Sequence, residues 1–193
     1  MTIQSARKTT WATTTNRQWR RPLTRVVSGC QTGAEQAALV AARAYRIPTG
    51  GWVPEGWRET VGSNAALLAA RFGLHEQRGG HAQSLRANIL DTDGTLSLSG
   101  DPAEPYERLC RRMLESSGTR VLELRLFRLP PIQDVAQWIV DSGIHALHVT
   151  GARERCRPPR VLPVCLAFFA DLFCALEYVA APNALAGFGV ASA

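Results

Sequence analysis

The first 25 residues of this 193-residue chain lack any acidic residue, although they carry Arg7, Lys8, Arg17, Arg20, Arg21 and Arg25. These six account for the whole net charge of +6, because they leave 16 of the 22 basic residues against 16 acidic ones. A formally neutral body lacks the basic patch that a nucleic-acid-binding face needs, so we expect no specific nucleic-acid partner. Residues 1–22 are expected to form a basic, disordered tail; the alternatives are a targeting segment, or weak binding to nucleic acid or to an anionic surface.

The chain also lacks paired cysteines and the apolar core of a secretory signal. Its cysteine count is odd, and no two cysteines have the CxxC spacing of a zinc or redox site; they are Cys30, Cys110, Cys156, Cys165 and Cys174. At this length a disulfide scaffold is not expected. We therefore predict reduced thiols in a cytoplasmic protein, with Cys165 and Cys174 as buried packing residues.

No apolar run is free of charge over the length of a membrane span. Residues 161–180 come closest, but Asp171 lies in the middle of this run and Glu177 near its end. A charge at the bilayer centre is costly, and Pro163 shortens the helical part. We predict a buried terminal helix with both acids pointing outward, and no membrane partner.

What the chain does contain is a regular alternation of strand and helix signals. Short apolar or β-branched runs predict strands, and apolar residues at helical spacing predict helices between them. The predicted strands are 23–29, a short one within 47–56, 95–100, 119–126 and 144–151; the predicted helices are 34–46, 63–71, 81–89, 103–117, 132–143 and 161–180. This order indicates one α/β domain over residues 23–181: a three-layer, Rossmann-like parallel sheet with helices on both faces. Residues 182–193 are expected to be a flexible tail.

Ligands of such folds bind beyond the carboxyl ends of the strands. Three predicted strands end at glycine, namely Gly29, Gly100 and Gly151. We expect the site at these ends and at the loop that contains Gly50 and Gly51.

The strongest local signal is the strand-to-helix turn Ser28-Gly29-Cys30-Gln31-Thr32-Gly33. Glycines let backbone N–H groups approach an anion, and a helix N-terminus adds unpaired donors and partial positive charge. The side chains of Gln31 and Thr32 can add hydrogen bonds. The turn matches neither the Walker A loop nor the GxGxxG fingerprint. The alternative is a plain glycine turn with Thr32 capping the helix.

Single residues elsewhere are further candidates, each with a structural alternative. Trp52 suits stacking on a pterin or base, or simple packing in its loop. Asp91 and Asp93, which precede Gly94, suit orienting a ribose or a metal-bound water, or ordinary Asp-Gly turn chemistry. Arg153 suits an oxyanion, or a surface pair with its neighbour Glu154.

Five ordered motifs carry a resemblance to a known family. They are VVSGCQTGAEQAAL from Val26, IPTGGWVPEG from Ile47, RFGLHE from Arg71, NILDTDGTL from Asn88 and HVTGARE from His148. Together they span about residues 24–180. In these stretches the chain resembles the putative molybdenum carrier family, a circularly permuted, YpsA-like branch of the SLOG superfamily.

The resemblance implies a Rossmann-like fold, a homo-oligomer, and binding of molybdate or molybdenum cofactor, whose pterin carries a phosphate. A molybdoenzyme that receives the cofactor is then an expected partner. The resemblance adds Asn88 and Thr95 to the binding residues proposed above. It implies no particular reaction.

The chain departs from the family pattern at two polar turns. Ser84-Leu85 stands where the family has Arg-Thr, and Ser99-Gly100-Asp101-Pro102 stands where it has Gly-Gly-Thr, a second anion-cradling turn. Asp101 would repel a phosphate, and Pro102 has no N–H to offer. Three functions therefore stay open: a carrier module, a sensor or degenerate paralogue that binds a nucleotide-derived ligand, and a nucleotide phosphoribohydrolase. The last is disfavoured because the chain has no PGGxGT loop, so the sequence favours a binding module over an enzyme.

Overall fold

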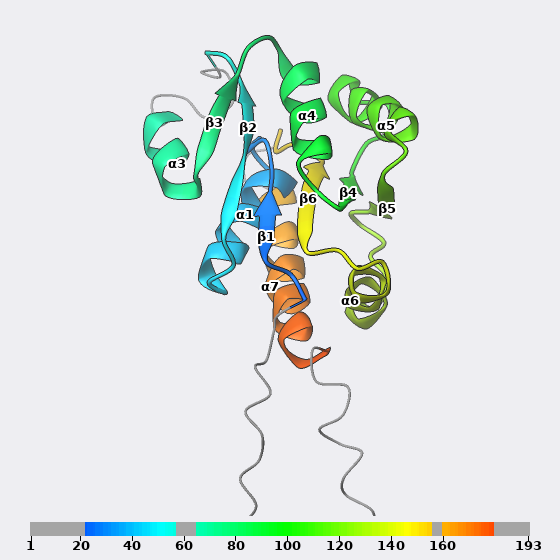
Figure 1. Ribbon diagram of the computed structural model, residues 1–193. Helices are drawn as coiled ribbons and strands as arrows, with labels where there is room; N and C mark the ends of the chain where they lie inside the picture. The colour runs from blue at the N-terminus through cyan, green and yellow to red at the C-terminus, as the bar shows by residue number, and fades with distance from the viewer. Residues whose placement is uncertain (1–21, 57–64, 156–159, 180–193) are drawn as a thin grey trace, which may run out of the picture.

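Six strands form one sheet in the order β3-β2-β1-β6-β4-β5, and every neighbouring pair is parallel (Figure 1). The computed structural model describes residues 22–56, 65–155 and 160–179. The strands are β1 Arg25–Val27, β2 Thr49–Pro54, β3 Leu74–Gln77, β4 Gly94–Ser99, β5 Arg120–Arg125 and β6 Ala146–Gly151. Because all of them run the same way, the loops after the strands meet at one edge of the sheet, which we call the carboxyl edge.

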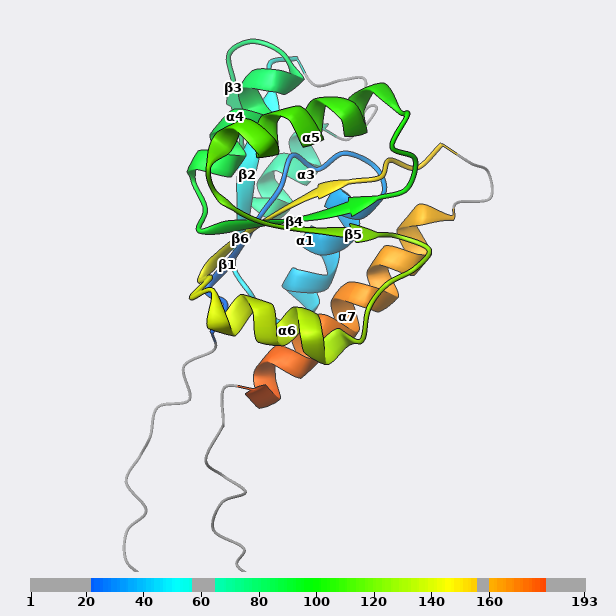
Figure 2. The ribbon, with the colours of Figure 1, turned by 90° about the vertical axis from the view of Figure 1, so that its right-hand side faces the viewer.

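Helices cover both faces of the sheet, as Figure 2 shows for α4 and α5 on one side and for α1, α6 and α7 on the other. They are α1 Ala34–Ala44, α3 Ala65–Phe72, α4 His81–Leu90, α5 Pro105–Ser117, α6 Ile132–Asp141 and α7 Val161–Val179. Right-handed crossovers explain the split. The connections from β1 through β3 and the connection from β5 to β6 cross the sheet in one direction. The connections from β3 through β5 cross it in the opposite direction, so their helices α4 and α5 lie on the opposite face.

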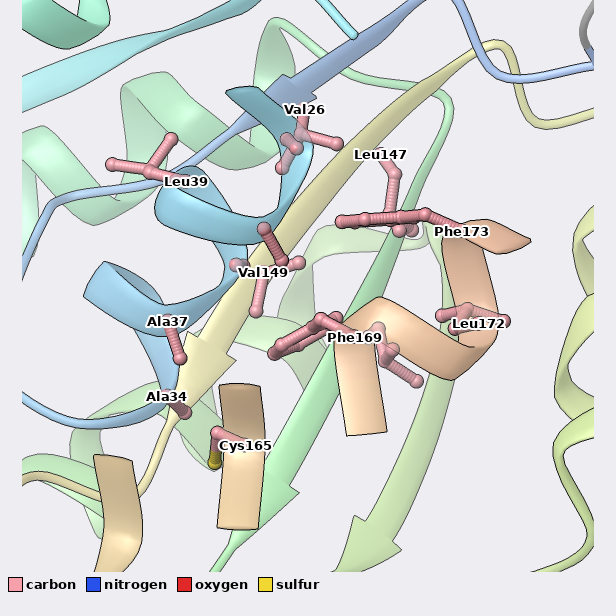
Figure 3. Packing of buried hydrophobic residues seen from close by; sticks show 14 of the residues in the cluster. Val26, Ala34, Ala37, Leu39, Leu147, Val149, Cys165, Phe169, Leu172 and Phe173 are labelled. Atoms are coloured by element: carbon pink, nitrogen blue, oxygen red, sulfur yellow. The ribbon is translucent and has the colours of Figure 1, made fainter. Parts of the chain in front are cut away.

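The main apolar core lies between the sheet and the pair α1 and α7. Small alanines on α1 let α7 come close, and aromatic side chains of α7 fill the space above β1 and β6 (Figure 3). Among the latter, Phe169 and Phe173 stack with ring centroids 5.8 Å apart. Strand alternation turns Leu147 and Val149 of β6 toward this core.

The other face of the sheet is polar along its middle strands. Thr95 and Ser97 of β4 and His148 and Thr150 of β6 are all buried there, beneath a small apolar cluster formed mainly by α4 and α5. His148 is fully buried: its Nδ1 lies 3.1 Å from Thr95 Oγ1, and its Nε2 has no hydrogen-bond partner in the described part of the chain. Burial lowers the pKa of His148 to about 3.

The fold class expected from the sequence is confirmed, and so is the terminal helix. Asp171 and Glu177 lie on the exposed side of α7, and no helix in the described ranges is long and apolar enough to cross a membrane. Two local expectations were wrong. The four-residue edge strand β3 was missed, and Gly50 and Gly51 lie inside β2 instead of in a loop. Both expected tails fall almost wholly outside the described residues.

Candidate functional site

The centre of the carboxyl edge is the point where the direction of winding changes. Strands β1 and β2 lead to one side of the sheet, strands β4 and β5 lead to the other, and β6 lies between β1 and β4. In doubly wound folds this switch point is where ligands bind. The loops that follow β1, β6 and β4 therefore define the candidate site.

The loop after β1 is tied to the chain that follows β6. Ser28 Oγ donates to Val149 O at 2.9 Å. Beyond it, Ala34 N donates to Ala152 O at 3.0 Å, and Glu154 N donates to Thr32 O at 3.0 Å. Gly33 sits in this crossing with φ 105°, and an added Cβ would lie 2.4 Å from Ala152 O. Only glycine fits there, so the close approach of the two segments explains the residue type.

The N-terminus of α1 keeps unused donors. Its cap is Gly33, and no side chain caps the helix, so the alternative in which Thr32 caps α1 is wrong. Within the part of the chain that the structure describes, the N–H groups of Thr32 and Gly33 donate to no carbonyl or side chain. Donors of this kind at the start of a helix suit an anion.

Arg153 follows the end of β6 and reaches the same edge. Its guanidinium lies 4.8 Å from the ring centroid of Tyr106 and pairs with Glu104 at 2.5 Å. Arg155 pairs with the same carboxylate. Arg153 Nε is buried and has no hydrogen-bond partner among the described residues. A guanidinium that lies over the Tyr106 ring and has its Nε–H donor unused is suited to contact an oxyanion.

Glu104 is the counter-ion of both arginines. Its burial opposes ionisation, but hydrogen bonds from Arg153 and Glu107 N, with the charges of Arg153 and Arg155, outweigh the burial and lower its pKa. The carboxylate is therefore charged at neutral pH. In this structure an internal carboxylate thus already pairs with both arginines at this edge.

Glu35, in the first turn of α1, ties three elements together beneath the site. Its carboxylate accepts hydrogen bonds from Gln31 N at 3.0 Å, from Tyr106 Oη at 2.6 Å and from Thr150 Oγ1 at 3.0 Å. It is only 1% exposed. Burial raises the pKa of Glu35 against the lowering effect of these hydrogen bonds. With both oxygens engaged and no exposure, Glu35 shapes the loop and does not reach a ligand.

Gln31 faces the helix that covers this end of the sheet. Its Nε2 lies 3.3 Å from Nδ1 of His81, the first residue of α4. The ring of His81 in turn meets Tyr106 edge-on, with centroids 5.9 Å apart. The side chain of Gln31 thus belongs to the wall of the site.

Trp52 and Asn88 form a structural pair. The side-chain amide of Asn88 accepts from Trp52 N at 2.7 Å and donates to Trp52 O at 2.9 Å. Both polar groups of Asn88 are thereby used to hold α4 against β2. The indole lies beside the ring of His75 on β3, with centroids 5.7 Å apart. Asn88 thus positions Trp52 near the carboxyl edge.

The remaining glycines serve close strand contacts or the β4 turn. A Cβ on Gly51 would lie 2.0 Å from Ser28 O, whereas Gly50 pairs with Val27 in the sheet. A Cβ on Gly151 would lie 2.1 Å from Leu98 O. Gly100 follows β4, and its N–H donates to the carboxylate of Glu107.

Asp93, Gly94 and Thr95 do not join the site, which corrects their expected placement. Asp93 lies at the opposite edge, where its Oδ2 accepts from His145 N at 2.9 Å and Ala146 N at 2.7 Å. Gly94 starts β4 against Ile144. The buried hydroxyl of Thr95 contacts His148. These residues precede or begin a strand, so the parallel sheet carries them to its amino edge.

Several residues of the site were not expected from the sequence. Tyr106, Thr150, Glu104 and Glu107 all lie at the carboxyl edge and contact Glu35, the arginines or the turn after β4. The first turn of a helix that follows a strand end was the available signal for Tyr106 and Glu107.

The profile of the circularly permutated YpsA SLOG family matches residues 26–170. The chain belongs to this family. A solved structure similar to this SLOG chain is the "Putative molybdenum carrier protein" of Syntrophus aciditrophicus SB, at 30% identity and a TM-score of 0.64. The match covers 79% of this chain and 96% of that one. A comparison with curated proteins gives no match.

Proposed function

We propose that this SLOG-family chain is a binding or carrier module for a small molecule that bears an oxyanion, namely molybdenum cofactor or molybdate. The observation that carries the proposal is the position of Arg153. It follows the central strand β6 and pairs across the backbone with Gly33, whose loop has unused N–H groups. The printed name of the similar Syntrophus protein supports a molybdenum-related ligand.

The donor set fits an oxyanion better than a bare metal ion. Guanidinium and backbone N–H groups donate hydrogen bonds and cannot ligate a cation. In the described ranges no group of three or more His, Cys, Asp or Glu side chains is placed to hold a metal ion. Burial, reinforced by the charge of Glu35, raises the pKa of Cys30 to about 12, so without a bound metal this fully buried thiol stays protonated at neutral pH. Molybdenum would thus be recognised through oxygen atoms of molybdate or through the phosphate of its cofactor.

The phosphoribohydrolase alternative finds no support in the geometry. It requires an acid that meets the substrate, and the acid that follows the loop after β1 is Glu35. Its carboxylate is buried and fully engaged by Gln31, Tyr106 and Thr150. The sensor alternative shares the same oxyanion site, so the identity of the ligand decides between it and the carrier function.

The test is thermal unfolding with a panel of molybdenum cofactor, molybdate, tungstate, phosphate and nucleotides. A ligand that binds only the native state adds about 2.7 kcal/mol at a hundredfold excess over Kd. We expect this stabilisation with molybdenum cofactor or molybdate, and its loss in Arg153→Gln. The matched control is Arg43→Gln, which removes an exposed arginine on the last turn of α1 and should respond as the unmodified protein does.

Each other outcome has a defined meaning. Stabilisation by a nucleotide alone would replace the carrier function with the sensor function. No stabilisation by any compound would contradict oxyanion binding altogether. Gly33 is unsuitable for this test, because a side chain there meets backbone atoms at 2.4 Å and 2.8 Å. The expected homo-oligomer and molybdoenzyme recipient stay predictions, which cross-linking in the presence of ligand can check.

A further inference from the structure

The turn after β4 holds an anion that belongs to the chain itself. The carboxylate of Glu107 accepts from Ser99 Oγ at 2.7 Å, from Gly100 N at 3.1 and 3.0 Å, and from Asp101 N at 3.1 Å. Glu107 is buried, with 7% of its surface exposed. Two successive backbone N–H groups and a hydroxyl that converge on one carboxylate form the kind of concavity that binds oxyanions.

Other donors of this turn are also satisfied within the chain. Ala103 N donates to Asp101 Oδ1 at 2.9 Å, and Glu107 N donates to Glu104 Oε2 at 2.9 Å. Pro102 and Pro105 have no N–H at all. Three carboxylates therefore surround the N-terminus of α5 and would repel a further anion.

The loop after β1, in contrast, is not surrounded by carboxylates in the described part of the chain. It has no acidic residue between Ser28 and Gly33, and only its Gln31 N–H is taken by a carboxylate, that of Glu35. Its Thr32 and Gly33 donors are unused within the described residues.

The two turns are close neighbours at the carboxyl edge. A Cβ placed on Gly100 would lie 3.0 Å from the Cβ of Ala152, and Glu104 of the β4 turn pairs with Arg153 of the β6 end. A ligand that carries two linked anionic groups could therefore meet both turns only by displacing Glu107.

We infer that Glu107 determines ligand specificity: its carboxylate fills the oxyanion-binding turn of β4, so the ligand presents a single anionic group. The inference rests on the proposed function and narrows it to a monophosphate or a single molybdate-like oxyanion. A diphosphate gains nothing from its second group, because the donors that would hold it are occupied.

The first experiment tests the turn without the unknown ligand. Glu107→Ala empties the turn, and the matched control Glu115→Ala removes an exposed acid from the same helix. Thermal unfolding is followed while inorganic phosphate replaces chloride at constant ionic strength. We expect phosphate to raise the midpoint of Glu107→Ala by about 3 °C or more beyond its effect on Glu115→Ala and on the unmodified protein. An equal effect on all three proteins overturns the inference.

Glu107→Gln covers the case in which the alanine variant does not fold. Its amide oxygen keeps one acceptor for the turn while the negative charge is lost, so phosphate should compete better than in the unmodified protein. The same comparison with Glu115→Gln decides the outcome.

The second experiment compares a nucleoside monophosphate with the corresponding diphosphate by calorimetric titration. We expect the two Kd values for the unmodified protein to agree within about threefold, and Glu107→Ala to bind the diphosphate about tenfold more tightly. A tenfold preference of the unmodified protein for the diphosphate overturns the inference. If the unmodified protein binds no member of either ligand panel, the proposed function has failed, and the phosphate response of Glu107→Ala still decides whether Glu107 fills the turn.

Discussion

Acidification should destabilise this fold through His148 at pH values where most proteins are still at their most stable. The imidazole is fully buried between the sheet and the helices α4 and α5, and burial lowers its pKa to about 3 from the usual 6.5. In the unfolded chain the same ring binds a proton near pH 6.5. Between these two pKa values the unfolded state therefore binds more protons than the native state, and stability falls as the pH falls.

The size of the effect follows from the difference between the two pKa values. Each pH unit between them lowers the free energy of unfolding by about 1.4 kcal/mol. His148 alone should then cost about 2 kcal/mol at pH 5 relative to pH 8, and about 4 kcal/mol near pH 3. The stability that neutral His148 contributes is fully present above pH 6.5.

Urea unfolding from pH 8 to pH 4 measures this slope. In His148→Gln the steep fall of the free energy of unfolding with pH should disappear, because glutamine does not titrate. The comparison is of slopes against pH, since the substitution also changes the stability at pH 8. His145→Gln is the matched control, since His145 is exposed and lies immediately before the same strand. Equal slopes for the unmodified protein and His148→Gln would refute the reasoning.

Two further predictions concern stability and thiol chemistry. Gly51→Ala should lower the free energy of unfolding in urea by about 3 kcal/mol or more, because its Cβ would lie 2.0 Å from Ser28 O at φ 149°. In the control Gly50→Ala, where the nearest atom to the added Cβ is 3.5 Å away, the loss should be about 1 kcal/mol or less. Equal losses would contradict this account of the contact between β1 and β2. Iodoacetamide at pH 8 should modify half-buried Cys174 before Cys30, because Cys30 is fully buried and burial raises the pKa of its thiol to about 12. Peptide mass spectrometry of the treated native protein measures the order of modification. Modification of Cys30 first would contradict its burial.

The order of strands and helices was largely predictable from the sequence, because most elements have an apolar pattern that matches their own period. The edge strand β3 was not, since His75 and Glu76 are exposed polar residues in a strand of four. Gly50 and Gly51 suggested a loop because glycine is a poor strand former. Their place in β2 depends on the approach of Ser28, a contact between segments that local propensity does not contain.

The candidate site was predictable only in part. The loop from Ser28 to Gly33 and Arg153 both follow strands, and the parallel sheet brings them together. Asp93 was assigned to the site from its side-chain chemistry, although its position before a strand sends it to the amino edge. The engagement of Glu107 with its own turn depends on the backbone path after Gly100, which no periodicity of the sequence encodes.

The central claim is that an oxyanion binds where the loop after β1 meets the end of β6. Its most direct test is a titration of ¹⁵N-labelled protein with molybdate and with inorganic phosphate, followed by the backbone amide chemical shifts. The account predicts the largest shifts at Thr32, Gly33 and Arg153, and unchanged signals for Asp93 and Gly94 at the amino edge. Shifts centred on the amino edge, or no shifts at saturating concentrations of both anions, would contradict it.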